Sequence, residues 1–257
     1  MIKEEKMTKS FKMEMGFPRE AEQAKAERWP VLIPVGTMEY HGPHCVFGCD
    51  SLVAEKICER AAQQIDCVLM PTIWYGVASY AVAGPEKNTI HVDCDAFETY
   101  MYHILKSMIY GGWRNIYMVI AHQSEDYNPM QLACMKAARK LIFEYLEDTK
   151  GKGWWGSNTN ANFFDDFHSG ENDNPWNWIN TFVTGVTKDM EEFNGEGDHA
   201  GRAECSEIGA LVPGSLRLER LGETDEWFTQ SATETDLEIG ERIAQAAVKG
   251  LIKFINK

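Results

Sequence analysis

The 257-residue chain lacks several features that would place it in a common class of protein. It has no apolar run of the roughly 20 residues that a membrane-spanning helix needs, so no membrane partner is expected. Its first residues are rich in Lys and Glu without an apolar core segment, so no secretory signal peptide is expected. Positive charge is scarce, because 25 Lys and Arg stand against 39 Asp and Glu, a net charge of −14. Phosphate binding requires clustered Lys and Arg, so nucleic acid is not an expected partner.

Cysteine signatures are also missing. The seven cysteines are an odd number, are scattered, and include no Cys-x-x-Cys pair. A disulfide framework is therefore not expected, and a reducing cytoplasm is the predicted location. Cys45 and Cys49 lack a second Cys/His pair at zinc-knuckle spacing, so a cysteine-based metal site is not predicted. The chain has neither a Gly-x-Ser-x-Gly elbow nor a phosphate-binding loop.

What the chain does contain is an alternation of two apolar periodicities. Short apolar runs at residues 31–35, 68–73, 116–120 and 181–186 are typical of buried strands. Apolar side chains recur at helical spacing in residues 51–64, 95–110, 129–145, 200–211 and 239–255. This alternation predicts the α/β class, with a mainly parallel sheet in a single domain. Residues 1–29 are expected to form an N-terminal arm and residues 30–257 the domain.

The loop after the first predicted strand carries the residue types of a metal site. It contains Glu39, His41 and His44 and runs on to Asp50. Glu39 and His41 are two residues apart, so in extended backbone their side chains face the same side. Two carboxylates and an imidazole suit zinc, manganese or a similar divalent ion. The alternative is that Asp50 caps a helix and the other polar residues lie on a surface loop.

Two later segments add candidates of the same kind. His122 and Glu125 follow the strand predicted at residues 116–120, where α/β proteins place their ligands. When His122 is considered alone, a hydrogen-bonded loop histidine is the favoured interpretation. His199 stands just before a predicted helix and Glu204 in its first turns, so both can reach one site. Taken singly, Glu204 is typical of a solvated helix surface.

Together these segments resemble the creatininase (creatinine amidohydrolase) family over most of residues 30–215. The most specific part is Pro-Val-Gly-Thr-Met-Glu-Tyr-His-Gly-Pro-His at residues 34–44, followed by an Asp eleven residues after the Glu. The stretch Asp-His-Ala-Gly-Arg-Ala-Glu-Cys-Ser at residues 198–206 matches a family segment of the form HAGxxETS, with Cys205 where Thr is usual. The resemblance implies a three-layer α/β/α creatininase-like fold and a hydrolase with two divalent metal ions, commonly zinc or manganese.

The resemblance also implies roles for individual residues. Glu39 and His122 would hold one metal and His41 the other, with Asp50 bridging them. A water molecule between two cations is acidified into a nucleophile. His199 resembles the family histidine that passes a proton to the leaving group, a role that suits an imidazole.

The chain departs from the family at one position. The family often has a Glu two residues after the strand-terminal histidine, where this chain has Ser124. Ser is a poor metal ligand, so Glu204 is the preferred replacement as ligand of the second metal and as a catalytic residue. Glu125 is the second choice.

A tryptophan-rich stretch provides the expected substrate contacts. Trp154, Trp176 and Trp178 resemble, in location, the loop with which creatininase-like enzymes cover their substrate. Trp rings stack on flat or sugar-like rings and exclude water. The alternative is that they pack at a subunit interface, where Trp is enriched. His44 and Glu125 are further expected substrate contacts.

The sequence therefore predicts a divalent-metal hydrolase that opens a small polar ring. The ring is a cyclic amide or a keto-inositol, so the bond broken is an amide C–N or a ketone C–C bond. One alternative is specifically a 3-dehydro-scyllo-inosose-type C–C hydrolase. Another is a non-catalytic metal-binding or regulatory protein whose second metal site has decayed. The resemblance further implies a homo-oligomer, a hexamer.

Overall fold

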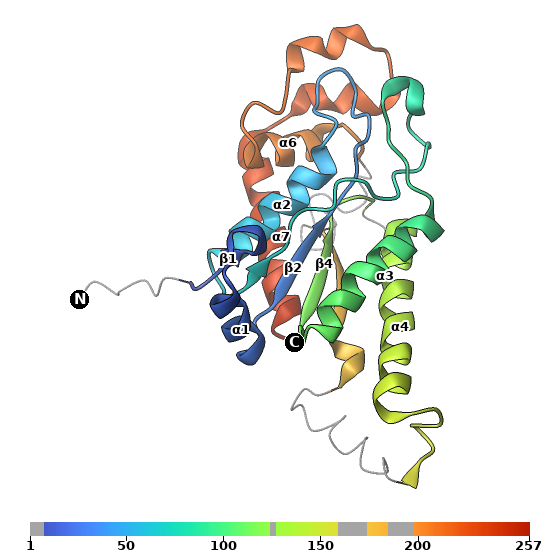
Figure 1. Ribbon diagram of the computed structural model, residues 1–257. Helices are drawn as coiled ribbons and strands as arrows, with labels where there is room; N and C mark the ends of the chain where they lie inside the picture. The colour runs from blue at the N-terminus through green and yellow to red at the C-terminus, as the bar shows by residue number, and fades with distance from the viewer. Residues whose placement is uncertain (1–7, 124–126, 159–173, 185–197) are drawn as a thin grey trace, which may run out of the picture.

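Five parallel strands form the centre of the protein (Figure 1). The structure, a computed structural model, describes residues 8–123, 127–158, 174–184 and 198–257. In their order across the sheet, the strands are β1 (Phe11–Lys12), β3 (Val68–Leu69), β2 (Val31–Val35), β4 (Ile116–Ile120) and β5 (Ile179–Val183). Each neighbouring pair of strands is parallel. The predicted mainly parallel sheet is confirmed.

Helices cover both faces of this sheet. On one side lie α1 (Pro18–Ala26), α3 (Cys94–Tyr110) and α4 (Pro129–Lys150), and on the other α2 (Cys49–Ala62), α6 (Arg202–Leu211) and α7 (Leu237–Ile255). The central strand β2 explains the two layers, because successive strand residues face opposite sides. Val31, Ile33 and Val35 pack into the first core, and Leu32 packs into the second. The three-layer α/β/α prediction is therefore confirmed.

Some element boundaries differ from the predictions. Strand β3 has two residues, although residues 68–73 form a longer apolar run. Helix α2 begins at Cys49, so Asp50 lies in its first turn rather than in the preceding loop. Strand β1, from the segment predicted as an N-terminal arm, pairs with β3 at the edge of the sheet. The boundary between arm and domain stays a prediction.

Helix α4 runs from the carboxyl ends of the strands to their amino ends. Its N-terminus is capped by Asn128, whose side chain accepts a hydrogen bond from the backbone N–H of Gln131, and Pro129 takes the first helical position as predicted. The helix has 22 residues and β4 has five. At about 1.5 Å per helical residue α4 is roughly 33 Å long, against about 17 Å for β4. The chain thus leaves α4 beyond the amino edge of the sheet (Figure 1).

Within the described residues, no helix has the length and apolar character needed to cross a bilayer. All seven cysteines are free thiols.

Candidate metal centre

The carboxyl ends of β2 and β4 bring the two predicted metal-site loops together. Val35 and Ile120 are paired as the last residues of these neighbouring strands, so both loops leave the same edge of the sheet. Gly36 permits the close packing that follows, because a Cβ at this position would lie 2.4 Å from the backbone nitrogen of Ser51. The start of α2 therefore lies directly against the end of β2, and this contact returns Asp50 to the strand ends.

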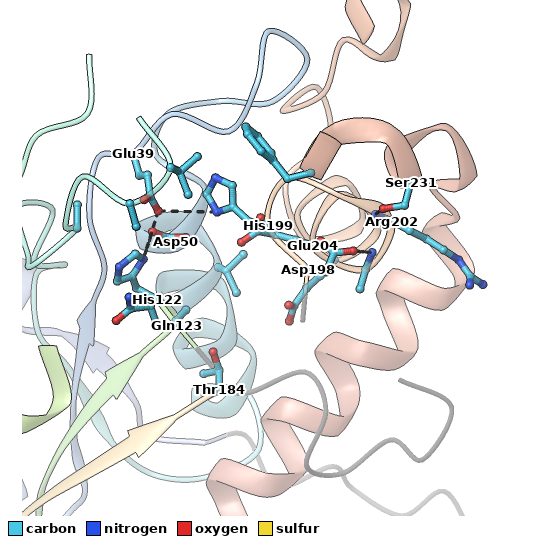
Figure 2. A pocket seen from close by; sticks show the side chains of 18 of the residues that line it. Glu39, Asp50, His122, Gln123, Thr184, Asp198, His199, Arg202, Glu204 and Ser231 are labelled. Atoms are coloured by element: carbon cyan, nitrogen blue, oxygen red, sulfur yellow. Dashed lines mark hydrogen bonds and ion pairs between the residues drawn. The ribbon is translucent and has the colours of Figure 1, made fainter. Parts of the chain in front are cut away.

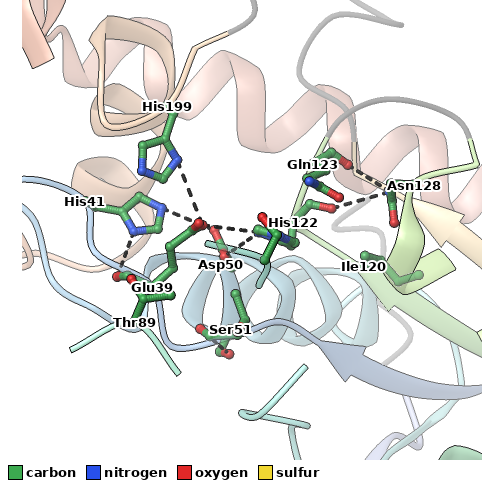
Figure 3. A network of polar contacts seen from close by, with 12 residues as sticks. Glu39, His41, Asp50, Ser51, Thr89, Ile120, His122, Gln123, Asn128 and His199 are labelled. Atoms are coloured by element: carbon green, nitrogen blue, oxygen red, sulfur yellow. Dashed lines mark hydrogen bonds and ion pairs between the residues drawn. The ribbon is translucent and has the colours of Figure 1, made fainter. Parts of the chain in front are cut away.

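Four of the predicted ligands form one buried cluster at this edge (Figure 3). Oδ2 of Asp50 lies 2.9 Å from Nδ1 of His122, and Oδ1 lies 3.3 Å from Nε2 of His41. Oε2 of Glu39 lies 3.4 Å from Nδ1 of His122. None of the four side chains is more than 6% exposed. Burying carboxylates is costly unless positive charge compensates them, so this cluster requires a cationic partner.

Glu204 reaches the cluster from α6. Its Oε1 lies 3.5 Å from Nε2 of His41, and its Oε2 accepts a hydrogen bond from the backbone N–H of Ala200 at 2.6 Å. Asp50 and Glu204 thus both present oxygens to the same imidazole nitrogen. The structure places Glu204 in the cluster and not on the solvated helix face that its position in the sequence alone suggests.

Three of the separations between these atoms match those of a metal-ligand shell, and the fourth, 2.9 Å between Asp50 and His122, is that of a hydrogen bond. Two ligand atoms that are each about 2.1 Å from a tetrahedral cation lie about 3.4 Å from one another. The observed separations are 3.4 Å between Glu39 and His122, 3.3 Å between His41 and Asp50, and 3.5 Å between His41 and Glu204. Asp50 belongs to two groups of candidate ligands, one with Glu39 and His122 and the other with His41, Cys49 and Glu204. A third group joins Glu39, His41 and His199.

The tautomer of His41 fits a role as a metal ligand. Nδ1 of His41 lies 3.0 Å from the backbone oxygen of Glu39, which can only accept, so Nδ1 carries the proton. In the neutral ring Nε2 of His41 then presents a lone pair towards two carboxylates, and this nitrogen is buried without a hydrogen-bond partner. A lone pair facing carboxylate oxygens is repulsive unless a cation lies between them. Metal-binding histidines characteristically donate their other N–H to a carbonyl, as His41 does.

The buried charges also shift one another's titration. Burial and repulsion from Asp50 raise the pKa of Glu39 to about 7. Burial lowers the pKa of His41, but the carboxylates of Glu204 and Asp50 outweigh it and raise that pKa well above its ordinary value. Burial opposes ionisation of Glu204, yet His41 holds the pKa of this carboxyl below its ordinary value. The cluster therefore takes up positive charge, either as protons or as metal cations.

His199 lies beside the cluster, at the position the sequence predicts. Its Nε2 donates a hydrogen bond to the backbone oxygen of Tyr40 at 2.9 Å, which leaves Nδ1 unprotonated and 3.9 Å from Oε2 of Glu39. The ring packs on that of His41, with 4.3 Å between centroids. A basic nitrogen of His199 thus faces the carboxylate cluster.

Hydrogen bonds to backbone groups fix the conformation of the loop that carries His199. Ala200 has a φ of 53°, a left-handed conformation that costs energy in a residue other than glycine and is frequent at functional sites. The carboxylate of Asp198 accepts a hydrogen bond from the backbone N–H of Ala203 at 2.7 Å. Nε2 of the buried His44 donates to the carbonyl of Ala200 at 3.0 Å. His44 does not belong to the described wall of the cavity, and its expected substrate contact stays a prediction.

A cavity of about 890 Å³ opens over the cluster (Figure 2). Its wall includes all of the clustered carboxylates together with His122 and His199. Ser79, Gln123 and Thr184 add polar groups that carry no charge. This volume lies in the range of small-molecule sites. Ser124 and Glu125 lie outside the described residues, so the metal and substrate roles considered for Glu125 stay predictions.

The predicted tryptophans lie at the opposite edge of the sheet. Trp154 follows α4, and Trp176 and Trp178 come just before β5. The guanidinium of Arg114 lies 3.9 Å from the ring centroid of Trp178, and the backbone oxygen of Trp178 accepts a hydrogen bond from Ile116, the first residue of β4. Trp154 and Trp178 are buried in the core beneath α4. The described chain therefore does not bring these rings to the cavity, because the length of α4 carries the chain past the sheet before they occur.

Comparison with known proteins identifies the family. A model of the creatininase family, described as creatinine amidohydrolase, matches residues 18–255. The chain belongs to the creatininase family. It is 28% identical over 102 residues to a 3-dehydro-scyllo-inosose hydrolase of Thermotoga maritima, covering 40% of this chain and 32% of that protein. It is 26% identical over 123 residues to the creatinine amidohydrolase of Pseudomonas putida, covering 47% of each protein. The matches thus span about a third and about half of these relatives' lengths.

Solved creatininase structures share the fold. A mutant creatininase in a zinc–zinc form superposes with a TM-score of 0.72 at 20% identity, covering 96% of this chain and 98% of that one. A manganese creatininase gives a TM-score of 0.69 at 21% identity, with the same coverage of 96% and 98%. At these identities the likeness establishes a creatininase-like fold.

In this creatininase-family chain, the cavity wall also contains two aromatic residues that were not predicted from the sequence, Trp227 and Phe228. Both belong to a short helix, η7 (Trp227–Glu234). Trp227 is 83% exposed, and the ring of Phe228 meets the ring of His199 edge-on at 5.4 Å. The available signal was a pair of adjacent aromatic residues within the otherwise polar residues 224–231. The substrate contacts expected of Trp154, Trp176 and Trp178 stay predictions.

Proposed function

We propose that the protein is a hydrolase that uses two divalent cations, zinc or manganese, bound in the buried cluster. The observation that carries this proposal is the position of Asp50, whose two oxygens face the imidazoles of His41 and His122. Glu39, Asp50 and His122 would hold one cation. His41, Asp50 and Glu204 would hold the other. When bound, two such cations acidify a water molecule and polarise the bond that it attacks.

His199 is the proposed proton carrier. Because its Nε2–H donates to the carbonyl of Tyr40, Nδ1 is the basic nitrogen, and it lies on the cavity side next to Glu39. A base in this position takes the proton of the attacking water and returns it to the leaving atom. Phe228 packs edge-on against the ring and fixes its plane. Glu204 supports this step by holding the Ala200 N–H of the same loop.

The proposed substrate is a small polar ring, a cyclic amide or a keto-inositol. Ser79, Gln123 and Thr184 offer hydrogen bonds to a polar ring, and Trp227 offers it an apolar face. Hydrolysis adds water across an amide C–N bond, or across a C–C bond next to a ketone, and leaves a carboxylate at the opened end. The names of the two curated relatives support both classes of substrate.

Ring opening of a substrate like 3-dehydro-scyllo-inosose is the more specific candidate. It is favoured by the match to the Thermotoga maritima relative. A polyhydroxylated ring requires several donors and acceptors around it, and the uncharged polar wall residues provide them. Comparing turnover of keto-inositols with turnover of creatinine separates this candidate from the cyclic-amide alternative.

Metal content and turnover together test the proposal. We expect two divalent cations per chain by mass spectrometry, and hydrolysis that a chelator abolishes and added zinc or manganese restores. The substrates to be compared are creatinine, other cyclic amides, formamides and keto-inositols, with Asp50→Asn as the inactive control. One cation or fewer per chain, without turnover of any of these compounds, would support the alternative of a metal-binding regulator with a decayed second site.

The proposal extends to a cytoplasmic homohexamer whose partner is a small molecule and neither nucleic acid nor membrane. The creatininase resemblance and the net charge of −14 support it. Exposed apolar side chains at Phe143 and Trp155, which are 52% and 68% exposed, provide material for contacts between subunits. Light scattering after gel filtration measures the mass, and a value equal to the 29.2 kDa chain would contradict the hexamer.

A further inference from the structure

The second cation subsite contains a donor atom that the proposed function leaves unused. Sγ of Cys49 and one ligand atom each of His41, Asp50 and Glu204 all lie within 4.8 Å of one another. Cys49 is fully buried and is the first residue of α2, immediately before Asp50. Two consecutive residues of this helix thus direct a thiol and a carboxylate to one point.

A buried nitrogen without a partner faces the same point. Nε2 of His41 makes no hydrogen bond, and the His41 side chain is 0% exposed. Its neighbours include the carboxylates of Asp50 and Glu204, which when ionised can only accept hydrogen bonds. A cation satisfies this lone pair and the surrounding acids together. The fourth side chain at this point, Cys49, is then within reach of the same cation.

The neighbouring thiol of Cys205 contacts other groups. Sγ of Cys205 lies 3.3 Å from Nε2 of His44 and 3.5 Å from the carbonyl oxygen of Ala200. Cys45 is partly exposed, whereas Cys49 is not. Among the described cysteines, Cys49 is the one grouped with the proposed ligands.

We propose that Cys49 is a ligand of the cation held by His41, Asp50 and Glu204. This inference rests on the cation centre of the proposed function. On binding, the S–H bond breaks, the sulfur electron pair forms the bond to the cation, and the proton passes to solvent. Thiolate is a soft donor, so this subsite selects zinc or cobalt over manganese or magnesium. The subsite of Glu39 and His122 has only oxygen and nitrogen donors and accepts either kind of ion.

Cobalt(II) is the probe, because a thiolate ligand gives it a sulfur-to-cobalt charge-transfer band in the near ultraviolet. The full-length protein is stripped with a chelator, loaded with cobalt, and measured for bound cobalt and for this band. We expect the band in the wild type, its loss in Cys49→Ser and Cys49→Ala, and its persistence in the matched variants Cys45→Ser and Cys205→Ser. In competition, we expect the ratio of bound zinc to bound manganese to fall about tenfold or more in Cys49→Ser.

The outcomes separate this inference from the proposed function. Three outcomes would overturn the role of Cys49 without contradicting the cation centre. They are cobalt bound without the band, a band that persists in Cys49→Ser, and a band that is lost in Cys45→Ser. Failure of the wild type to bind cobalt overturns the cation centre itself. If the Cys49 variants do not fold, X-ray absorption of the zinc-loaded wild type decides, because a zinc–sulfur distance of about 2.3 Å is required.

Discussion

Oδ2 of Asp50 lies 2.9 Å from Nδ1 of His122, although 72 residues separate them in the chain. Asp50 comes from the first turn of α2, and His122 follows the end of β4. The contact exists because β2 and β4 are neighbours in the sheet and Gly36 lets α2 pack against the end of β2. Asp50 is thereby common to both of the proposed cation subsites.

Asp50→Asn is expected to remove both cations, whereas Glu39→Gln is expected to remove one. The reason is that Asp50 belongs to both of the proposed cation subsites, whereas Glu39 is a proposed ligand only of the subsite with Asp50 and His122. Loss of a carboxylate ligand lowers cation affinity by about 10- to 100-fold or more. Mass spectrometry of the purified variants gives cations per chain, and circular dichroism confirms the fold. The exposed Glu147→Gln serves as the control, and unchanged metal content in both site variants would disprove the assignment.

Glu204→Gln distinguishes the two candidates for the last ligand. The amide keeps an oxygen that can accept the Ala200 N–H, but it loses the charge that faces His41. We expect this variant to hold one cation per chain and Glu125→Gln to hold two. The reverse pattern would assign the second subsite to Glu125 in place of Glu204.

Trp178→Ala is expected to lower stability, whereas Trp227→Ala is expected to weaken substrate binding. Trp178 is 8% exposed and contacts Arg114, so its truncation is expected to cost about 3–5 kcal/mol of the free energy of unfolding. Trp227 is 83% exposed on the cavity wall, so its truncation is expected to change stability by within about 0.5 kcal/mol and to raise KM. Denaturant titrations and kinetics with the substrate that is turned over measure both effects. A raised KM for Trp178→Ala with unchanged stability would instead restore the predicted lid.

Glu207 is expected to make the metal-free protein less stable as pH rises. Its carboxyl lines the cavity, and burial together with repulsion from Glu204 raises its pKa to about 8, from 4.5 in the unfolded chain. Below pH 4.5 both states are protonated and no cost arises. Between the two values the unfolded state releases a proton that the folded state retains, so stability falls by about 1.4 kcal/mol per pH unit. Above the folded pKa of about 8 the loss levels off.

Glu207→Gln removes this pH dependence because the amide does not titrate. Urea unfolding of chelator-treated protein at several pH values between 5 and 8 measures the slope for the wild type and the variant. Glu147→Gln, at an exposed position of α4, is the matched control and is expected to keep the wild-type slope. Equal slopes in the wild type and Glu207→Gln would show that Glu207 ionises normally in the folded state.

The candidate ligands at the strand ends could be placed from the sequence, whereas the residues farther along the chain could not. Glu39, His41 and His122 follow apolar runs that must be buried strands, and parallel strands gather their carboxyl ends at one edge. His199 and Glu204 could be placed only through the family motif, because no local pattern shows what a helix start will face. Cys49 could not be recognised as a candidate ligand, because no Cys/His pair at zinc-knuckle spacing accompanies it and its neighbours in the fold are His41, Asp50 and Glu204.

The sequence by itself determined the α/β layers and the edge at which the site forms, since hydrophobic periodicity and strand order act through local geometry and burial. Only the tertiary structure decided which side chains share the cavity. The 22 residues of α4 carry Trp154 to the far edge of the sheet, while the packing of η7 against α6 brings Trp227 and Phe228 to the cavity. These placements depend on helix lengths and on contacts between segments far apart in the chain, which no pattern within one segment encodes.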